Sequence, residues 1–316
     1  MKLKKLLDDP SAIDRPEVGL LMHKLVSELW PITRSITGPG VRETLEILRR
    51  EIPELTIQSI PSGTKCFDWT VPEEWSITEA FIENEAGNRI VDFKNNNLHV
   101  VGYSVPVDEW LDLPHLQAHL HSLPDQPNAI PYVTSYYSRR WGFCMTHEQR
   151  QSLQPGRYRA VVQSELKPGV LNYGEVILPG NSDGEVLLST YICHPSMANN
   201  ELSGPVVLTA ITAWLTSFTR RKYTYRILFI PETIGAITYL SMNVEQMKSK
   251  QSPDTLSLVL ATIERILSCL HVQEILSRTW QRCMYCVTSR LITANILFST
   301  AAAMSVNIAA PASICL

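Results

Sequence analysis

The sequence lacks an apolar run long enough to cross a bilayer, so it predicts no membrane-spanning helix. Charge is also scarce: charged residues make up 19% of the 316, and the formal net charge is −3. Without a basic excess, the chain has no electrostatic footprint for nucleic acid or an anionic membrane. The basic N-terminus turns acidic at Asp8 and Asp9, which makes a poor secretion signal. We therefore expect a cytoplasmic globular protein without nucleic-acid or membrane partners.

The 7 cysteines give no clear disulfide framework. Three of them, Cys66, Cys144 and Cys193, are dispersed and are typical of reduced thiols in a cytoplasmic chain. The other four lie in the last fifth of the sequence, where Cys283 and Cys286 have the spacing of half a zinc site. We interpret that spacing as chance, because of the nature of the tail described below.

The pattern of apolar and polar residues changes twice along the chain. Residues 17–31 and 41–52 have apolar positions at helical spacing. From residue 55, short alternating runs separated by Pro, Gly and Asn predict a β-rich module that reaches to about residue 155. Beyond it, continuous apolar runs at 186–193 and 225–230 predict buried parallel strands, and helix candidates follow at 202–218 and 234–248. This alternation predicts a three-layer α/β domain.

Polar residues follow both predicted strands at the point where each strand ends. His194 comes directly after the first, with Asn199, Asn200 and Glu201 close behind, and Glu232 ends the second. In open α/β sheets the chemistry lies at the carboxyl ends of the strands. His194 and its loop could hold a metal, or could only cap the strand and the next helix. Glu232 could be a general base or an acid that stabilises a helix N-terminus.

Two long motifs carry a family resemblance. CHPSMANNELSG at 193–204 and FIPETIGAITYL at 229–240 resemble the central motifs of bacterial aminopeptidase-like proteins, members of the clan of di-zinc aminopeptidases. The segments LWPITRSITGPGVRETL at 29–45 and PYVTSYYSRRWGFCM at 131–145 are similar to the same subfamily, which has an inserted β-rich domain of unknown role. The resemblance spans about residues 20–248 and implies a zinc-aminopeptidase-like fold.

The resemblance implies a role for each matching residue. His194 matches the first zinc ligand, and Glu232 matches the general base. Asn200 stands where the clan has a bridging Asp, and Thr233 stands at the neighbouring acidic ligand position. Neutral Asn and Thr bind zinc far less well than carboxylates. The metal candidates are therefore His194, Asn200 and Glu201, with a single zinc held by His194 together with Glu201 as the reduced form of the site.

After residue 250 the resemblance stops and acidic residues become rare. A shifted reading frame takes the third base of each codon together with the first two bases of the next codon. In that frame, the codons of residues 260–272 can encode GDDRAYSFLPSR, which is similar to the family's next motif. The same offset allows residues 299–316 to encode a second family-like string. We interpret residues 251–316 as an out-of-frame tail, with a genuine divergent sequence as the alternative. As written, the tail lacks the Gly-Asp-Asp motif that the resemblance implies would supply an acidic ligand.

Four segments follow: N-terminal helices of the aminopeptidase-like domain at 17–54, the inserted β-rich domain at 55–155, the α/β core at 156–250, and the tail at 251–316, which leaves the fold incomplete. Three functions stay open. The first is a metal-dependent hydrolase of aminopeptidase type acting on a peptide or other small substrate. The second is a non-catalytic peptide- or saccharide-binding protein, and the third is an inactive product of a damaged gene. The sequence leaves the oligomeric state open.

Overall fold

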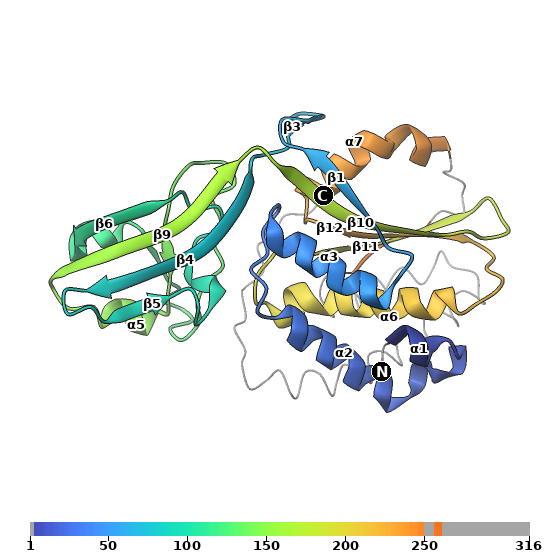
Figure 1. Ribbon diagram of the computed structural model, residues 1–316, viewed down its shortest axis with the longest axis horizontal. Coiled ribbons are helices and arrows are strands. Elements are labelled where there is room, and N and C mark those ends of the chain that lie inside the picture. Colours follow the sequence, from blue (N-terminus) through green and yellow to red (C-terminus); the bar gives the residue numbers. More distant parts are fainter. Residues whose placement is uncertain (1–2, 250–255, 261–316) are drawn as a thin grey trace. The chain divides into compact units, whose positions relative to one another are not determined.

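The computed structural model describes residues 3–249 and 256–260, which divide into two compact units. Residues 74–167 form one unit, and the described residues on either side of them form the other. Figure 1 shows the elements of both. The elements of the first part of the chain are α1 (Leu3–Leu7), a 3-10 turn (Pro10–Asp14), α2 (Pro16–Leu29), α3 (Pro39–Glu51), β1 (Thr56–Pro61), β2 (Lys65–Cys66) and β3 (Trp69–Thr70).

A five-stranded mixed sheet organises the larger unit. Its order is β1-β10-β12-β11-β13, with β11, β12 and β13 parallel and the other pairs antiparallel. The remaining elements of this unit are β10 (Val170–Leu178), β11 (Glu185–Tyr191), a π-helical turn (Ala198–Leu202), α6 (Ser203–Thr216), β12 (Thr224–Ile230), α7 (Ile234–Ser249) and β13 (Leu256–Leu260). The predicted helices and buried strands of this part are confirmed.

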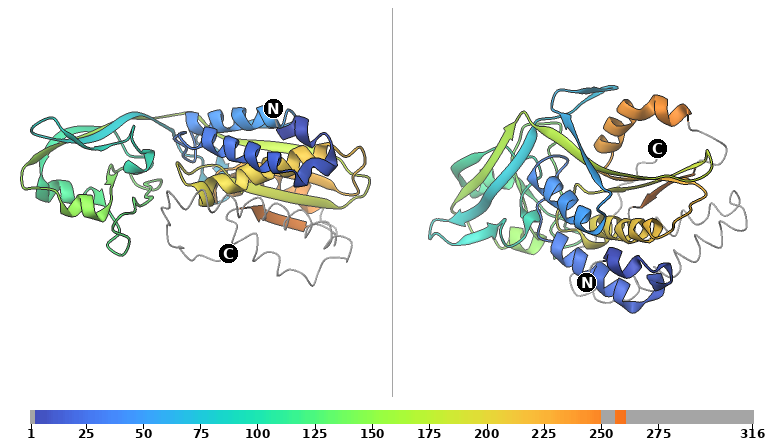
Figure 2. Two further views of the ribbon diagram at one scale, coloured as in Figure 1. Left: turned by 90° about the horizontal axis from the view of Figure 1, so that it is seen from below. Right: turned by 45° about the vertical axis from the view of Figure 1, so that its right-hand side comes forward.

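Helices cover both faces of this sheet. Side chains alternate along a strand, and Ile227 and Phe229 of β12 point into one apolar core with α1, α2, α3 and α6. Arg226 points to the opposite face, where it meets Tyr239 of α7. Figures 1 and 2 show the same division, with α7 on the far side of the sheet from α3 and α6. The predicted three-layer α/β architecture is therefore confirmed.

The smaller unit is β-rich, as predicted. Its antiparallel sheet has the order β5-β4-β9-β6 and packs over an apolar core of its own. Its elements are β4 (Glu74–Asn84), β5 (Arg89–Asp92), a 3-10 turn (Asn97–His99), β6 (Val107–Asp112), α4 (Leu113–Gln117), β7 (Leu120–His121), β8 (Phe143–Cys144), α5 (His147–Gln151) and β9 (Arg157–Lys167).

The expected boundaries of this insertion, residues 55 and 155, are wrong. Strand β1 belongs to the larger sheet, because Thr56–Pro61 pairs with β10. Strand β9 belongs to the insertion, because it pairs with β4 and β6. The expected start of the domain at residue 17 is also too late, since Leu3, Leu6 and Leu7 of α1 are buried in the larger core. An edge strand of the larger sheet and a strand of the insertion have the same alternation of apolar and polar residues, so the sequence alone did not separate them.

The prediction that residues from about 251 onward add nothing to the sheet is wrong for β13. Leu256–Leu260 pairs in parallel with β11, and its sequence, LSLVL, is the kind of apolar run that suits a buried strand. The rest of the predicted out-of-frame tail, with its four cysteines, lies outside the described residues. Within the described ranges, no helix combines the length and the apolar character needed to span a bilayer.

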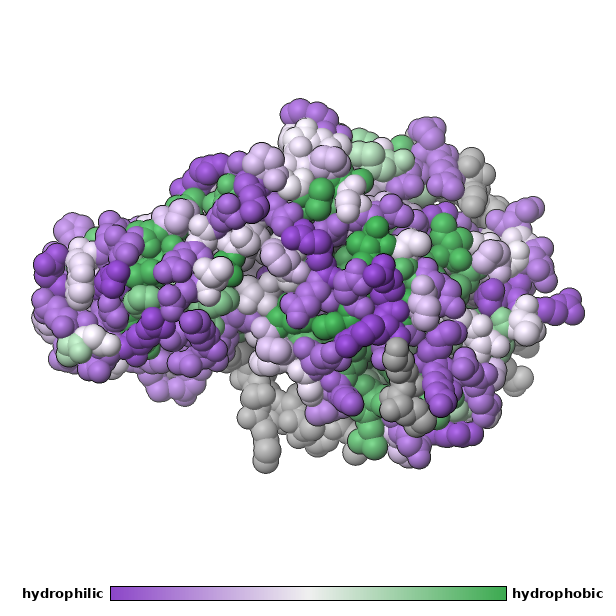
Figure 3. All heavy atoms as spheres, viewed as in Figure 1, coloured by the Kyte–Doolittle hydropathy of each residue, from purple (hydrophilic) through white to green (hydrophobic). Residues whose placement is uncertain are grey.

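On the face drawn in Figure 3, hydrophilic side chains predominate, and hydrophobic ones form small groups between them. This is the usual surface of a globular chain, whose larger apolar side chains are turned inward.

Candidate functional site

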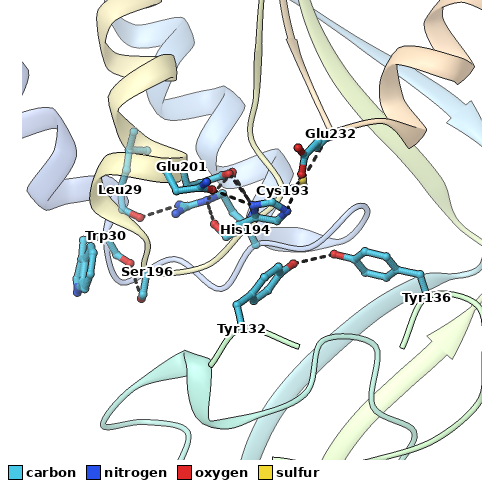
Figure 4. Close-up of polar contacts among 11 residues, drawn as sticks. Leu29, Trp30, Tyr132, Tyr136, Cys193, His194, Ser196, Glu201 and Glu232 are labelled. Carbon is cyan, nitrogen blue, oxygen red and sulfur yellow. Dashed lines mark hydrogen bonds and ion pairs between the residues drawn. The ribbon is translucent and has the colours of Figure 1, made fainter. Parts of the chain in front are cut away.

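The strand register brings the two sequence motifs to one edge of the larger sheet. Tyr191 of β11 lies opposite Ile230 of β12, and both strands run in the same direction. His194 follows the first of these residues, and Glu232 follows the second. The Nε2 atom of His194 lies 3.3 Å from Oε2 of Glu232 (Figure 4). The proximity expected from the strand order is thus present.

A π-helical turn places the next two candidates on the other side of the imidazole. In this turn, Ala198–Leu202, the N–H of Leu202 donates to the carbonyl of Met197, 3.2 Å away. The Oδ1 atom of Asn200 lies 3.4 Å from His194 Nδ1, and Oε2 of Glu201 lies 3.3 Å from the same nitrogen. Turns of this type are frequent at functional sites.

Thr233 turns the chain at the end of β12 with a left-handed backbone, φ 54°. A β-branched residue rarely adopts this conformation, and backbone strain of this kind is common at functional sites. The N–H of Ile234 donates back to the carbonyl of Glu232 at 2.5 Å, and the N–H of Glu232 donates to Sγ of Cys193 at 3.2 Å. The turn fixes where the exposed Glu232 carboxylate emerges.

Burial sets the electrostatics of these groups. Desolvation lowers the pKa of His194 to about 4, and the charge of Arg34 acts in the same direction. The imidazole is therefore neutral at neutral pH. Burial raises the pKa of Glu201, which is fully enclosed, while the Arg34 guanidinium and the backbone N–H groups of His194 and Cys193 oppose that rise.

A neutral imidazole carries one proton, and the surroundings favour Nδ1 for it. Two acceptor oxygens, from Asn200 and Glu201, face that nitrogen. The lone pair of Nε2 then faces the Glu232 carboxylate, so two acceptors oppose each other at 3.3 Å. A cation between them would relieve this opposition.

The described residues supply only part of a metal centre. Within that part of the chain, no group of three or more His, Cys, Asp and Glu side chains could hold a metal. Asn200 and Glu201 face Nδ1 of His194, and Glu232 faces Nε2 on the other edge of the ring. A single ion therefore cannot bind all three side chains. Their roles as ligands or base stay predictions.

Sequence reasoning missed Arg34, whose Nε donates to the carbonyl of His194 at 2.9 Å. A single arginine in the segment PITRSITGP has no spacing that marks it. The sequence also gave no sign that Cys193 is more than an ordinary thiol. Its sulfur accepts a hydrogen bond from the backbone N–H of Glu232. No sequence pattern predicts either contact.

Comparison with known proteins identifies the family. A family model described as "Domain of unknown function (DUF4910)" matches residues 23–264, more than half of the chain. The chain belongs to the DUF4910 family. The match ends beyond residue 250, the point where the resemblance was expected to stop, and it includes the residues of β13.

A relative from Clostridium acetobutylicum has a name that pairs polysaccharide biosynthesis with an aminopeptidase-like domain. It is 48% identical over 233 residues, which are 74% of this DUF4910 chain and 53% of the relative. A crystal structure from the same organism, described as that of a peptidase, is 44% identical with a TM-score of 0.74 and covers 81% of this chain and 59% of its own. The chain thus spans little more than half the length of these relatives.

More distant structures show the fold alone. A zinc aminopeptidase from Bacillus subtilis is 10% identical with a TM-score of 0.50, covering 78% of this chain and 69% of its own. An M28 peptidase precursor from Shewanella amazonensis is 9% identical with a TM-score of 0.52, covering 78% and 72%. The larger unit of this DUF4910 protein therefore has the aminopeptidase-like fold that the motifs predicted.

Proposed function

We propose that this chain is a metal-dependent hydrolase of aminopeptidase type, to which the described residues contribute His194 and Glu232. The observation that carries the proposal is the 3.3 Å approach of His194 Nε2 to the Glu232 carboxylate at the carboxyl ends of two parallel strands. The Clostridium relatives, described as aminopeptidase-like and as a peptidase, support the same class of reaction.

The chemistry divides between these two residues. His194 Nε2 is the proposed zinc ligand, because its neutral imidazole directs a lone pair toward the exposed side of the site. When bound, zinc would polarise the substrate carbonyl and acidify a water molecule. Glu232, whose side chain is 46% exposed, is the proposed general base that accepts the proton of the attacking water. Asn200 and Glu201 are proposed to orient the imidazole instead of binding the ion.

The proposed substrate is a small peptide or another small molecule with a hydrolysable carbonyl group. The name of the Clostridium relative adds polysaccharide biosynthesis as a source of such molecules. A cytoplasmic location is part of the proposal and is supported by the buried free thiols of Cys66, Cys144 and Cys193.

A second candidate function is a non-catalytic protein that binds a peptide or a saccharide on the same scaffold. The positions of Asn200 and Thr233 favour it, because neutral side chains stand where the resemblance implies acidic ligands. Both functions place a ligand at the same sheet edge, and turnover separates them.

Zinc titration against a competing chromophoric chelator tests the first proposal. His194→Gln is expected to weaken zinc binding about tenfold or more, while Asn199→Ala, in the same turn but with an exposed side chain, leaves it unchanged. Equal zinc affinity in the wild type and His194→Gln would overturn the proposed centre.

Hydrolysis of aminoacyl nitroanilides and dipeptides, measured with zinc present, tests the role of Glu232. Glu232→Gln is expected to lower kcat by about 10²–10⁴-fold, the usual contribution of a general base. A wild-type protein that binds zinc and these substrates without turning them over would favour the binding function instead.

A further inference from the structure

Arg34 is a fully buried cation beside the candidate site. Its side chain is 0% exposed, and its hydrogen bonds go to backbone carbonyls: Nε donates to His194 at 2.9 Å and Nη1 donates to Leu29 at 2.7 Å. Its Nη2 is buried and has no hydrogen-bond partner within the described residues. Burial of an ion carries a large desolvation cost, so a compensating charge is needed. That charge is Glu201, whose Oε1 lies 3.9 Å from Arg34 Nε.

The segment that carries Arg34 is fixed against the sheet edge. It links α2 to α3, and a glycine in the first turn of α3 allows it to pass close to that helix. A Cβ atom at Gly40 would lie 2.0 Å from the carbonyl oxygen of Thr33, so no larger residue fits there without displacing the segment. On the other side, the hydroxyl of Ser196 donates to the carbonyl of Trp30 at 3.1 Å (Figure 4). The guanidinium therefore has a set position.

Glu201 connects this cation to the imidazole. Its Oε1 accepts the backbone N–H of His194 at 2.8 Å. Its Oε2 is buried, makes no hydrogen bond within the described residues, and lies 3.3 Å from His194 Nδ1. Arg34 and Glu201 together contact the carbonyl, the N–H and the ring of a single residue.

We infer that Arg34 is a positioning residue for His194: it holds the His194 carbonyl directly and, through the Glu201 carboxylate, the Nδ1 edge of the ring. This inference deepens the proposed function and rests on it for its consequence. With Nδ1–H between the acceptor oxygens of Glu201 and Asn200, which lie 3.3 Å and 3.4 Å from that nitrogen, the Nε2 lone pair is left for the open side of the site. Histidines that bind metals commonly donate their other ring nitrogen to a carboxylate, and loss of that partner weakens metal affinity by about 10–100-fold.

The test uses the metal-free full chain and the ¹⁵N NMR signals of labelled histidine, which report which ring nitrogen carries the proton. The His194 signals are assigned by their loss in His194→Gln. The wild type is expected to carry the proton on Nδ1. Glu201→Gln is expected to shift it toward Nε2, because the amide must keep its oxygen on the His194 N–H and therefore turns its NH₂ toward Nδ1, which leaves the Asn200 oxygen as the remaining acceptor there. Arg34→Met is expected to give both tautomers, because Glu201 loses its anchor.

Arg226→Met is the matched control, since Arg226 is another buried arginine paired with carboxylates but lies on the opposite face of the sheet. It is expected to lower stability without changing the His194 tautomer. Arg34→Lys keeps the charge but not the fork of donors, and it is expected to restore the wild-type tautomer in part. If Arg34→Met does not fold, Glu201→Gln tests the Glu201 end of the same link, because it preserves the shape of the side chain while it removes the charge and replaces one acceptor oxygen with a donor.

Zinc affinity separates the two inferences. Arg34→Met and Glu201→Gln are expected to bind zinc about 10–100-fold more weakly than the wild type. If the wild type binds no zinc while Arg34→Met and Glu201→Gln both move the proton, the proposed function fails and the positioning role stands. An unchanged Nδ1 proton in a folded Arg34→Met or in Glu201→Gln, or the Nε2 tautomer in the wild type, would overturn the positioning role whatever the zinc affinity.

Discussion

At the scale of single residues, one histidine determines what the site can do. The two ring nitrogens of His194 face different carboxylates, the buried Glu201 and the exposed Glu232. This asymmetry gives the two acids different tasks even though both are glutamates. In the proposed function, the enclosed one orients the ring and the exposed one reaches water.

Acid should destabilise the metal-free protein through His194. Burial lowers the pKa of His194 to about 4, below the ordinary value of 6.5. Between these values the unfolded chain binds a proton that the folded chain does not, so stability is intact above about pH 6.5 and declines as the pH falls toward 4. The expected loss is at most about 3 kcal/mol.

Urea denaturation from pH 7 to pH 4.5, with a chelator present, measures this loss. His194→Gln has no titrating ring at this position and should lose less stability over the same range. Parallel loss in the two proteins would contradict the assignment of this acid sensitivity to His194.

At the scale of elements, a charged cluster joins helix α7 to the sheet. Arg226 of β12 lies 2.8 Å from Glu175 of β10 and 2.6 Å from Glu185 of β11. The hydroxyl of Tyr239 in α7 donates to Glu175 at 2.7 Å and accepts from Arg226 at 3.0 Å. The cluster fixes α7 against the face opposite the main core, and α7 begins directly after the Glu232 turn.

Arg226→Ala should therefore destabilise the protein by about 3–5 kcal/mol, because it leaves two carboxylates without their cation at a largely buried position. Urea denaturation of the metal-free protein measures the change. Arg49→Ala is the control, since the Arg49 side chain is 47% exposed and its pair with Glu46 is expected to contribute about 0–1 kcal/mol. Similar losses in both variants would show that the cluster does not hold α7.

At the scale of the whole molecule, the chain contains two units with separate cores. The insertion leaves and rejoins the larger unit at paired residues, since Glu74 lies opposite Lys167 in the antiparallel β4–β9 pair. Its apolar core contains residues of the insertion alone, among them Ile82, Phe143 and Val162. A unit that begins and ends at one place and buries its own core meets the physical requirements for independent folding.

The fragment 74–167, expressed alone, should fold cooperatively with a β-rich circular dichroism spectrum. The fragment 55–155, which has the boundaries expected from sequence, is the matched control. It lacks β9, an inner strand of the four-stranded sheet, and should remain unfolded. A folded 55–155 fragment, or an unfolded 74–167 fragment, would contradict this division.

Much of this structure could be predicted from local patterns. The helical spacing in residues 17–31 and the apolar runs before His194 and Glu232 indicated α2, β11 and β12, because burial on one or both faces leaves a periodic signature in the sequence. Strand β1 could not be assigned in this way. Its residue pattern is that of any half-exposed strand, and only its hydrogen bonds to β10 show which sheet it joins.

The sequence by itself determined the fold class, the family motifs, and the placement of His194 and Glu232 at strand ends, because each depends on residues close together in the chain. Only the tertiary structure decided that Glu201 faces Nδ1 and Glu232 faces Nε2, and that Arg34 reaches His194 across 160 positions of sequence. These contacts arise from packing between elements that are distant in the chain. A buried charge requires a partner, but no local pattern shows which residue provides it.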